Sequence, residues 1–391
     1  INTILNTEWI HKIRDGRVTL KRTRFQTVFA NDVNPKVMAA WVPFFSNRGI
    51  HTNIFRLGSI VDLVKFNAFP STADVITGGF PCQDFSVAGR RRGFSSTKSH
   101  RGDDLQSNDE PSLENRGALY IWMREAVSIV KPKVFIAENV KGLVSLSDVQ
   151  AVIQKDFSNG AGEEYLVVSR VLKAADYGVP QPRERILFIG FQKRLLHPRM
   201  IRALQAKKIP TTLDPFPIPT HTGGLVGTSE TQPRYLMPWV TVRQSIGDLP
   251  EPAQSHSDLS QQAYSKAKWY GYHCQGQTEV KLDGLGPTIR AEHHGNIEFR
   301  RLSQEVGGKY YDELKAGLRE RRLSVRECAR LQTFPDSYEF VRKTPNGEYG
   351  QRLSPSDGYR MIGNALPPLL GYHIARRLQK LWPVFFNAEE S

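Results

Sequence analysis

The chain has 391 residues, of which 39% are hydrophobic and 24% are charged, proportions that are ordinary for a globular protein. Its formal net charge of +14 favours a polyanionic partner such as nucleic acid. Its length suits two domains, and no run of about 18 apolar residues is long enough to cross a membrane. Three scattered cysteines exclude a disulfide framework and a CxxC metal site, so we expect a reducing, cytoplasmic setting.

Apolar runs in the first 190 residues alternate with helix-like segments, which is typical of a parallel α/β sheet. Strands are predicted over 26–30, 73–77, 133–137 and 185–190, a helix over 118–130, and another helix after Pro367-Pro368. Asp32, Cys82 and Glu138 each follow one of these strands. Ligands bind beyond the carboxyl ends of strands in such sheets, so we expect these three side chains to lie close together.

Two stretches interrupt the alternation. Residues 86–117 are rich in Gly, Ser, Arg and Asp, and a loop of that length inside a compact domain is usually functional or mobile. From residue 192 onward prolines are frequent, and aromatic and basic residues are interleaved. We therefore predict a large α/β domain, 1–191 plus 355–391, with a smaller irregular domain inserted at 192–354.

The best candidate nucleophile is Cys82, in Gly78-Gly79-Phe80-Pro81-Cys82-Gln83. The glycines allow a tight turn and the proline stiffens it, so the turn would present the thiol. The basic residues Arg90-Arg91-Arg92 that follow would help to hold a thiolate. The alternative is a packed core cysteine, which is the commonest fate of a free cysteine.

Other polar residues follow or precede apolar strands. Glu138 comes directly after one, so burial should raise its pKa and keep it protonated, unless it is a structural carboxylate bound by backbone donors. Gln181, Arg183 and Arg185 lie on one face of an extended segment and could bind an electron-rich ring or a phosphate. A solvated edge strand is the alternative there.

Asp32 is placed where an acid binds ribose hydroxyls in dinucleotide folds, but the usual glycine-rich turn before it is missing, since residues 1–24 contain only Gly16. His293-His294 has no further Cys or His at ligand spacing, so we predict no metal site.

Five motifs together resemble the C5-cytosine DNA methyltransferases, and most closely the bacterial restriction–modification members. They are Gly79-Phe80-Pro81-Cys82-Gln83, Glu138-Asn139-Val140, Gln181-x-Arg183-x-Arg185, Arg326-Glu327-Cys328-Ala329-Arg330-Leu331-Gln332 and Gly363-Asn364-Ala365-Leu366-Pro367-Pro368, in the family's order. The resemblance implies a Rossmann-like methyltransferase domain that uses S-adenosylmethionine, and an inserted target-recognition domain that reads double-stranded DNA.

The resemblance also implies roles. Cys82 would add to C6 of a flipped cytosine, Glu138 would donate a proton to N3, and Arg183 and Arg185 would hold the cytosine O2. Cofactor contacts are expected from Asp32, Val33, Ser59, Ile60, Pro81, Leu119, Asn364 and Leu366, although the family usually has Asp where Ser59 stands. Thr288 resembles a residue that touches phosphate, and Ser86, Arg90 and Arg92 lie in a loop that closes over DNA. Cys328 resembles a packed helix residue.

Candidates for reading bases in the inserted domain are Arg234, Trp239, Lys266, Trp269, Tyr272, His273, Gln275 and Gln277. Of these, Gln275 and Gln277 are assigned to DNA binding. The expected partner is double-stranded DNA at the bacterial nucleoid, bound by a monomer, with a cognate restriction endonuclease acting separately and no membrane. The alternatives are a tRNA cytosine-5 methyltransferase of the same fold and a non-catalytic DNA-binding relative.

The first family motif, a Phe-x-Gly-x-Gly loop that holds the methionine end of the cofactor, is absent from the sequence. We therefore expect the natural protein to carry about 15–30 further residues, forming a strand and a glycine-rich turn, by the usual spacing of this fingerprint. A chain that begins at Ile1 should then bind S-adenosylmethionine poorly.

Overall fold

The computed structural model describes residues 10–14, 17–80, 120–145, 149–159, 164–224, 236–268, 270, 278–291, 297–343 and 351–386. The strands are β1 (Ile10–Arg14), β2 (Arg17–Leu20), β3 (Ala30–Asp32), β4 (Phe55–Leu57), β5 (Val75–Gly79), β6 (Val134–Val140), β7 (Tyr165–Lys173), β8 (Glu184–Gln192), β9 (His221–Thr222), β10 (Met237–Pro238), β11 (Phe299–Arg301) and β12 (Arg321–Arg322). The helices are α1 (Pro35–Ser46), α2 (Ile60–Lys65), α3 (Tyr120–Val130), α4 (Val149–Asn159), α5 (Pro198–Gln205), α6 (Val242–Ile246), α7 (Leu259–Gln262), α8 (Tyr311–Lys315), α9 (Val325–Leu331), α10 (Pro355–Asn364) and α11 (Pro368–Phe385).

The main sheet has four strands in the order β5-β6-β8-β7. The strands expected over 73–77, 133–137 and 185–190 are confirmed as β5, β6 and β8, and the two expected helices as α3 and α11. The parallel sheet expected from the sequence is confirmed only in part: β5 and β6 are parallel, but β8 is antiparallel to both β6 and β7. Glu138 also lies within β6 rather than beyond its end.

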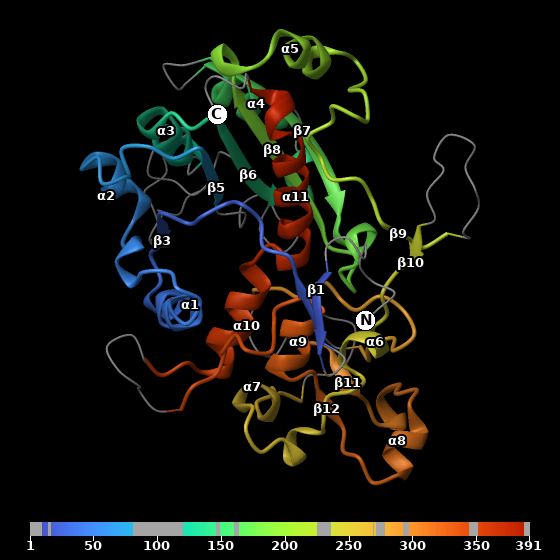
Figure 1. The fold of residues 1–391 in the computed structure, drawn as a ribbon. Helices are drawn as coiled ribbons and strands as arrows, with labels where there is room; N and C mark the ends of the chain where they lie inside the picture. The colour runs from blue at the N-terminus through green and yellow to red at the C-terminus, as the bar shows by residue number, and fades with distance from the viewer. Residues whose placement is uncertain are drawn as a thin grey trace, which may run out of the picture.

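The main sheet is the middle of three layers. Leu187, Ile189 and Phe191 of β8 pack with α5 and α11, whereas Ile186 and Phe188 face the core formed with α3 and α4. Figure 1 shows α11, in red, running across the near face of the green strands. Burial on both faces explains why β8 reads as a continuous apolar run.

A second, smaller sheet pairs β3 with β4 in parallel. The strand predicted over 26–30 begins only at Ala30, and Phe25 and Val28 before it are exposed. The side-chain amide of Asn31 donates to the carbonyls of Arg56 and Gly58 at 2.8 and 2.9 Å, which fixes the loop after β4 beside the end of β3.

A cavity of about 3310 Å³ lies between the two sheets, lined by residues of β3 on one side and of β5 on the other. It is larger than the roughly 300–1,000 Å³ of typical ligand pockets. It extends along the whole of β5, from Asp74 before the strand to Gly79 at its end.

A second hydrophobic core lies around α9 and joins parts of the chain that are far apart in sequence. Val242 and Ile246 of α6, Leu331 of α9 and Ile362 of α10 belong to it, together with Ala39 of α1. By contrast, hydrophobic residues from Leu196 to Phe216 pack in the core of the main sheet. The composition of the sequence had placed this segment in the inserted domain. Packing therefore ties both ends of the 192–354 region to the α/β domain.

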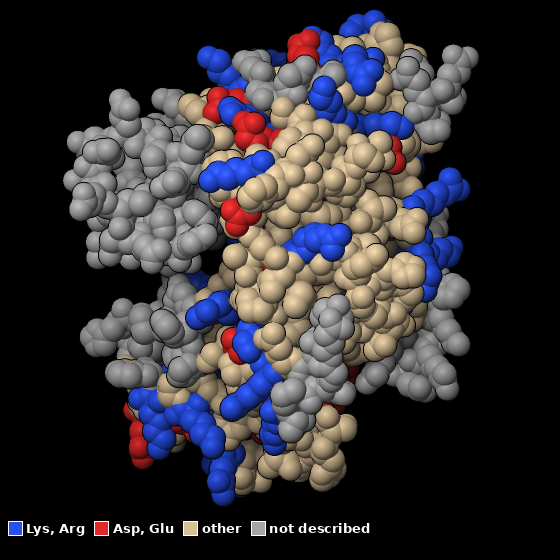
Figure 2. Space-filling view, turned by 90° about the vertical axis from the view of Figure 1, so that its left-hand side faces the viewer, with Lys and Arg blue, Asp and Glu red and all other residues tan. Residues whose placement is uncertain are grey.

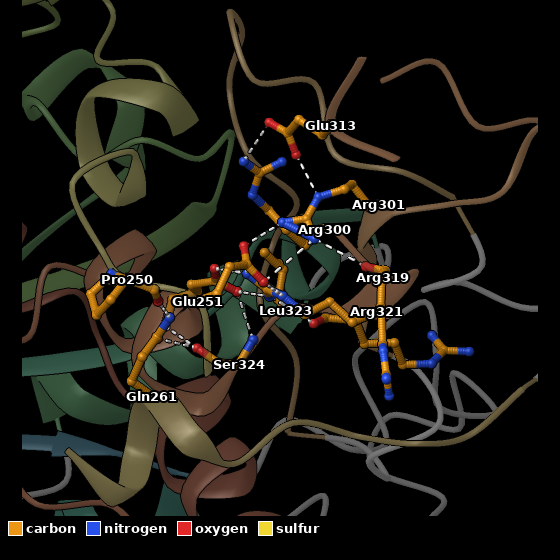
Figure 3. A network of polar contacts seen from close by, with 12 residues as sticks. Pro250, Glu251, Gln261, Arg300, Arg301, Glu313, Arg319, Arg321, Leu323 and Ser324 are labelled. Atoms are coloured by element: carbon orange, nitrogen blue, oxygen red, sulfur yellow. Dashed lines mark hydrogen bonds and ion pairs between the residues drawn. The ribbon is translucent and has the colours of Figure 1, made fainter. Parts of the chain in front are cut away.

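Buried arginines connect the elements around this second core (Figure 3). Arg321, 4% exposed, donates to both oxygens of Glu327 at 2.8 and 2.9 Å and also binds Glu251. Arg301 binds Glu251 and Glu313. Buried arginines require acidic partners, because removing one partner leaves an uncompensated charge and lowers the free energy of unfolding by about 3–5 kcal/mol. Within the described residues, no helix is long and apolar enough to cross a bilayer.

Gly190 in β8 provides a test of the packing between the sheet and α4. A Cβ at Gly190 would lie 2.0 Å from the ring of Phe135, which stacks on Phe157. Gly190→Ala should therefore lower the free energy of unfolding by about 1–3 kcal/mol, the usual cost of overpacking. Gly58→Ala is the matched control, because nothing lies within 4 Å of its added methyl group. Equal melting temperatures for the two variants would contradict this packing.

Candidate active site

The ends of β5 and β6 bring Glu138 next to the chain that leads to Cys82. In the parallel register Gly79 is paired with Glu138, and a Cβ on Gly79 would lie 3.1 Å from Oε2 of that carboxyl group. A larger residue at position 79 would therefore crowd the carboxyl group. Asn139, 1% exposed, donates from Nδ2 to the carbonyl of Phe80 at 3.3 Å, which holds the first residue beyond β5.

The side chain of Arg185 contacts Glu138 across the sheet. In the antiparallel pairing of β6 with β8, Arg185 is opposite Val140, so Glu138 is its diagonal neighbour on the same face. The Nε of Arg185 lies 2.7 Å from Oε1 of Glu138, and the two side chains are 12% and 19% exposed. The contact uses Oε1 and leaves Oε2 on the side of Gly79.

Burial raises the pKa of Glu138 above its ordinary value, and the nearby positive charges of Arg185 and Arg183 only partly oppose this effect. A carboxyl group in this setting retains its proton at higher pH than one in water. The interpretation of Glu138 as a desolvated acid is therefore consistent with its surroundings.

The second arginine of the motif has different contacts. Arg183 is 1% exposed; its Nη1 donates to the carbonyl of Ile289 at 2.8 Å, and its Nη2 donates to the carbonyls of Gly363 at 2.8 Å and Ala365 at 3.1 Å. It precedes β8 and binds the backbone of two distant segments. Arg185 contacts the carboxyl group of Glu138 directly, and Arg183 contributes a nearby positive charge.

The predicted catalytic, cofactor-binding and phosphate-contacting residues that the structure describes line the cavity between the main sheet and the β3–β4 sheet, whereas Gln181, Trp239 and Lys266 are not among its lining residues. The predicted residues that line it are Asp32, Val33, Ser59, Ile60, Glu138, Arg183, Arg185, Thr288, Asn364 and Leu366. They come from widely separated parts of the sequence, so the fold brings the predicted catalytic, cofactor and phosphate-contact residues to one place.

At the β3 end of the cavity, the donors and acceptors suit a polar nucleoside. Asp32 ends β3; burial raises the pKa of its carboxyl group, and the backbone amide of Asn34 donates to its Oδ1 at 2.7 Å. Ser59 caps α2 by accepting from the backbone of Val61 at 3.2 Å, so its hydroxyl keeps its proton for donation. Val33 beside them is 68% exposed and offers an apolar surface.

Several predicted site residues lie outside the described residues. They are Pro81, Cys82, Ser86, Arg90, Arg92, Leu119, Gln275 and Gln277, and also Arg234, Trp269, Tyr272 and His273 among the proposed base readers. Cys328 is confirmed as a packed residue of α9, because it is fully buried and burial raises the pKa of its thiol. Within the described part of the chain, no group of three His, Cys, Asp or Glu side chains could hold a metal ion.

Trp239, a proposed base reader, has structural partners. Its Nε1 donates to Asp176 at 3.0 Å, and the ammonium of Lys173 lies 3.8 Å from the centre of its ring. A Cβ on Gly223 would lie only 2.3 Å from the same ring, so the ring is packed against the backbone. These contacts show that Trp239 helps to attach β9 and β10 to the rest of the protein, and its proposed role in reading bases stays a prediction.

Two buried glutamines close to the site were not fully recognised from sequence. Gln181 was predicted as a ligand-facing donor, yet it is fully buried and bonds to Gln332 instead. Gln332 received no role beyond membership of its motif. The feature of the sequence that could have indicated a role for Gln332 is its place at the end of a capped helix, where polar side chains often bond to free backbone groups.

Comparisons with known proteins agree with this geometry. Residues 12–380 match the family model of the C-5 cytosine-specific DNA methylase. The type II methyltransferase M.BspRI of Lysinibacillus sphaericus is 31% identical over 90% of this chain and 70% of its own length. M.NgoFVII of Neisseria gonorrhoeae is 30% identical over 90% of this chain and 82% of its own length. In fold, the chain is similar to the S. pombe Dnmt2 methyltransferase, with a TM-score of 0.52, 15% identity and coverage of 91% and 92% of the two chains.

The likeness to this methyltransferase structure, together with the family match, identifies the mixed α/β fold as that of the S-adenosylmethionine-dependent methyltransferases. The chain belongs to the C-5 cytosine-specific DNA methylase family. It is a DNA (cytosine-5-)-methyltransferase, and its methyl donor is S-adenosylmethionine.

The raised pKa of Glu138 predicts how stability depends on pH. The ordinary pKa is 4.5, and a carboxyl group whose folded-state pKa is higher contributes stability below that value and loses it as the pH rises through the folded pKa. The Glu138→Gln variant does not lose this stability, because glutamine does not ionise. The melting temperature of the variant minus that of the wild type should therefore increase between about pH 4.5 and pH 8.

Glu184→Gln is the control for that measurement, because Glu184 lies on the other side of β8 and pairs with Lys141 at 3.0 Å. A difference between Glu138→Gln and the wild type that stayed constant with pH would show that the carboxyl group is not desolvated in the folded protein.

Proposed function

We propose that the protein methylates C5 of cytosine within a specific sequence of double-stranded DNA, through a covalent Cys82 adduct with a flipped target base. We further propose that it protects host DNA in a type II restriction–modification system, because relatives such as M.BspRI and M.NgoFVII are type II methyltransferases. In this proposal a cognate endonuclease acts separately, and the methyltransferase binds DNA as a monomer in the bacterial cytoplasm.

The observation that carries the catalytic proposal is the close approach of the end of β5 to Glu138, since a Cβ added at Gly79 would lie 3.1 Å from Oε2 of the carboxyl group. Cys82 follows Phe80 by two residues, so its Cα can lie no more than about 7 Å from that of Phe80, whatever the conformation between them. This short connection supports the proposal that the thiol acts close to Glu138 and Arg185. In the six-membered ring of cytosine, C6 and N3 lie at opposite corners. A thiol can therefore act at C6 while a carboxyl group acts at N3.

In the proposed reaction, the thiolate of Cys82 forms a bond to C6 of the cytosine. The electron pair displaced toward the ring is accepted at N3, where Glu138 donates its proton from Oε2 while Oε1 accepts from Arg185. C5 then carries the nucleophilic electron pair and takes the methyl group. Loss of the C5 proton to a base re-forms the C5=C6 double bond as the thiolate leaves C6, and N3 returns its proton to Glu138, which releases the neutral methylated cytosine.

Arg185 has two roles in this proposal. It orients Glu138 by the 2.7 Å contact, and its remaining nitrogen donors can hold the cytosine O2. Arg183 supports the site from behind by binding the backbone at Ile289 and Gly363. A base in duplex DNA hides C6, so flipping it into the cavity is required at a cost of a few kcal/mol.

S-adenosylmethionine supplies an electrophilic methyl group when bound. The residues of this chain that would hold it are Asp32 at its ribose, Val33 and Ile60 against its adenine, Ser59 at the adenine edge, and Asn364 and Leu366 on the opposite wall. All six line the same cavity. Pro81 and Leu119 complete this proposed set.

DNA is proposed to lie between the α/β domain and the target-recognition domain, 192–354. Thr288 would contact a phosphate, Ser86, Arg90 and Arg92 would close over the DNA, and Gln275 and Gln277 would read bases. The net charge of +14 favours this partner, and on the face in Figure 2 the Lys and Arg side chains outnumber the acidic ones toward the lower end.

The covalent step is tested with duplex DNA that carries 5-fluorocytosine at the target position, in the presence of S-adenosylmethionine. Fluorine cannot leave as a proton does, so the wild type should form an adduct that survives denaturing electrophoresis. Cys82→Ser should form none. Cys328→Ala is the matched control and should still form the adduct, because Cys328 is buried in α9.

An adduct that persisted in Cys82→Ser would rule out this nucleophile. An adduct formed with structured tRNA in preference to DNA would instead favour the RNA-modifying alternative.

A further inference from the structure

Three segments that carry proposed site residues meet at a junction behind the cavity. One is 180–183, which leads into β8 and Arg185; another is 286–291, which contains Thr288; the third is 363–365, which contains Asn364. The backbone amide of Gly286 donates to the carbonyl of Pro180 at 2.8 Å. The three segments are far apart in sequence, so their relative positions depend on direct contacts.

Gln181 and Gln332 form the centre of this junction, and both are fully buried. Nε2 of Gln181 donates to Oε1 of Gln332 at 2.6 Å and to the carbonyl of Leu331 at 2.8 Å, while its Oε1 accepts from the backbone amide of Ile289 at 3.2 Å. Nε2 of Gln332 donates to the carbonyl of Ala365 at 2.5 Å. A continuous chain of hydrogen bonds therefore runs from Ile289 to Ala365.

A close backbone approach joins the same two segments a second time. A Cβ on Gly363 would lie 2.1 Å from the carbonyl carbon of Arg290 and 2.3 Å from the backbone nitrogen of Ala291. Only glycine allows the end of α10 to approach the 286–291 segment this closely. Arg183 binds both segments as well, through Ile289 and Gly363.

We propose that Gln332 and Gln181 are positioning residues, which set the cofactor-binding turn at Asn364 and the DNA-contacting segment at Thr288 in a single fixed arrangement. Neither glutamine lines the cavity, so neither can touch the cofactor or the DNA there. The inference rests on the proposed roles of Asn364 and Thr288. Its consequence is that one change at Gln332 weakens binding of both ligands.

The test is Gln332→Met in the full-length protein, because methionine keeps the volume and removes both amide hydrogen bonds. The probes are S-adenosylhomocysteine, titrated by calorimetry, and a duplex that contains the methylated sequence, titrated by fluorescence anisotropy. Both dissociation constants should rise by about tenfold, the scale expected when a buried hydrogen-bonding group loses its partner.

Gln261→Met is the matched control. Gln261 is 1% exposed, donates to the carbonyl of Pro250 at 2.6 Å and accepts from the hydroxyl of Ser324 at 2.6 Å (Figure 3), but it lies away from the cavity. It should lose a similar amount of thermal stability and bind both ligands like the wild type. If Gln332→Met also bound both like the wild type, or weakened only one, the positioning role would be refuted.

Gln332→Glu keeps the inference testable if the methionine variant does not fold. A protonated glutamic acid at 332 can still accept from Gln181 and donate to Ala365, whereas the ionised form has lost the donor. Both affinities of this variant should improve as the pH falls from about 8 to about 6, relative to the wild type, and a constant ratio would overturn the proposal. A wild type that did not bind the DNA would contradict the proposed function itself, whereas weak cofactor binding is already expected of a chain that begins at Ile1.

Discussion

The site depends on the antiparallel pairing of β6 with β8. That register places Arg185 opposite Val140 and therefore diagonal to Glu138 on one face of the sheet. Because side chains alternate along a strand, a slip of one residue would move Arg185 to the opposite face and leave a buried carboxyl group without its partner. The continuous apolar run of β8, packed between two helical layers, makes such a slip costly.

The same pairing explains why two arginines in one motif have different roles. Arg185 lies in β8 and its side chain remains on the face of Glu138, whereas Arg183 precedes the strand and binds carbonyls that are contributed by residues 289 and 363. One arginine thus acts on the carboxyl group, and the other fixes the walls around it. The hydrogen bonds of Arg183, Gln181 and Gln332 thus join parts of the chain that are distant in sequence into one wall of the cavity.

Local pattern was sufficient to predict the elements that are buried on both faces. The runs at 133–137 and 185–190 are continuous and apolar because the sheet is covered on both sides. The pattern at 26–30 failed because Val28 is exposed and pairing with β4 begins only at Ala30. β7 was missed, since polar residues such as Ser169 and Arg170 interrupt its apolar sequence.

The predicted site followed from motifs, and the fold brings its described members to one cavity. What sequence could not supply was the direction of each side chain. The partners of Arg183 are 106 and 180 residues away, and the contact of Trp239 with Asp176 spans 63 residues. No local periodicity encodes such contacts, so the structural partners of Arg183 and Trp239 could not be predicted from the sequence, although Arg183 also lines the cavity as a ligand-facing residue would.

The central claim is that Glu138 acts as the acid in the cavity, and single-turnover methylation by Glu138→Gln tests it most directly. Glutamine keeps the shape and can still accept from Arg185, but it has no acidic proton to donate to N3. The methylation rate should fall by about 100-fold or more, the scale of general acid catalysis, while the dissociation constant for DNA changes little. A variant that methylated DNA at the wild-type rate would contradict the account, because Glu138 would then be a structural carboxyl group.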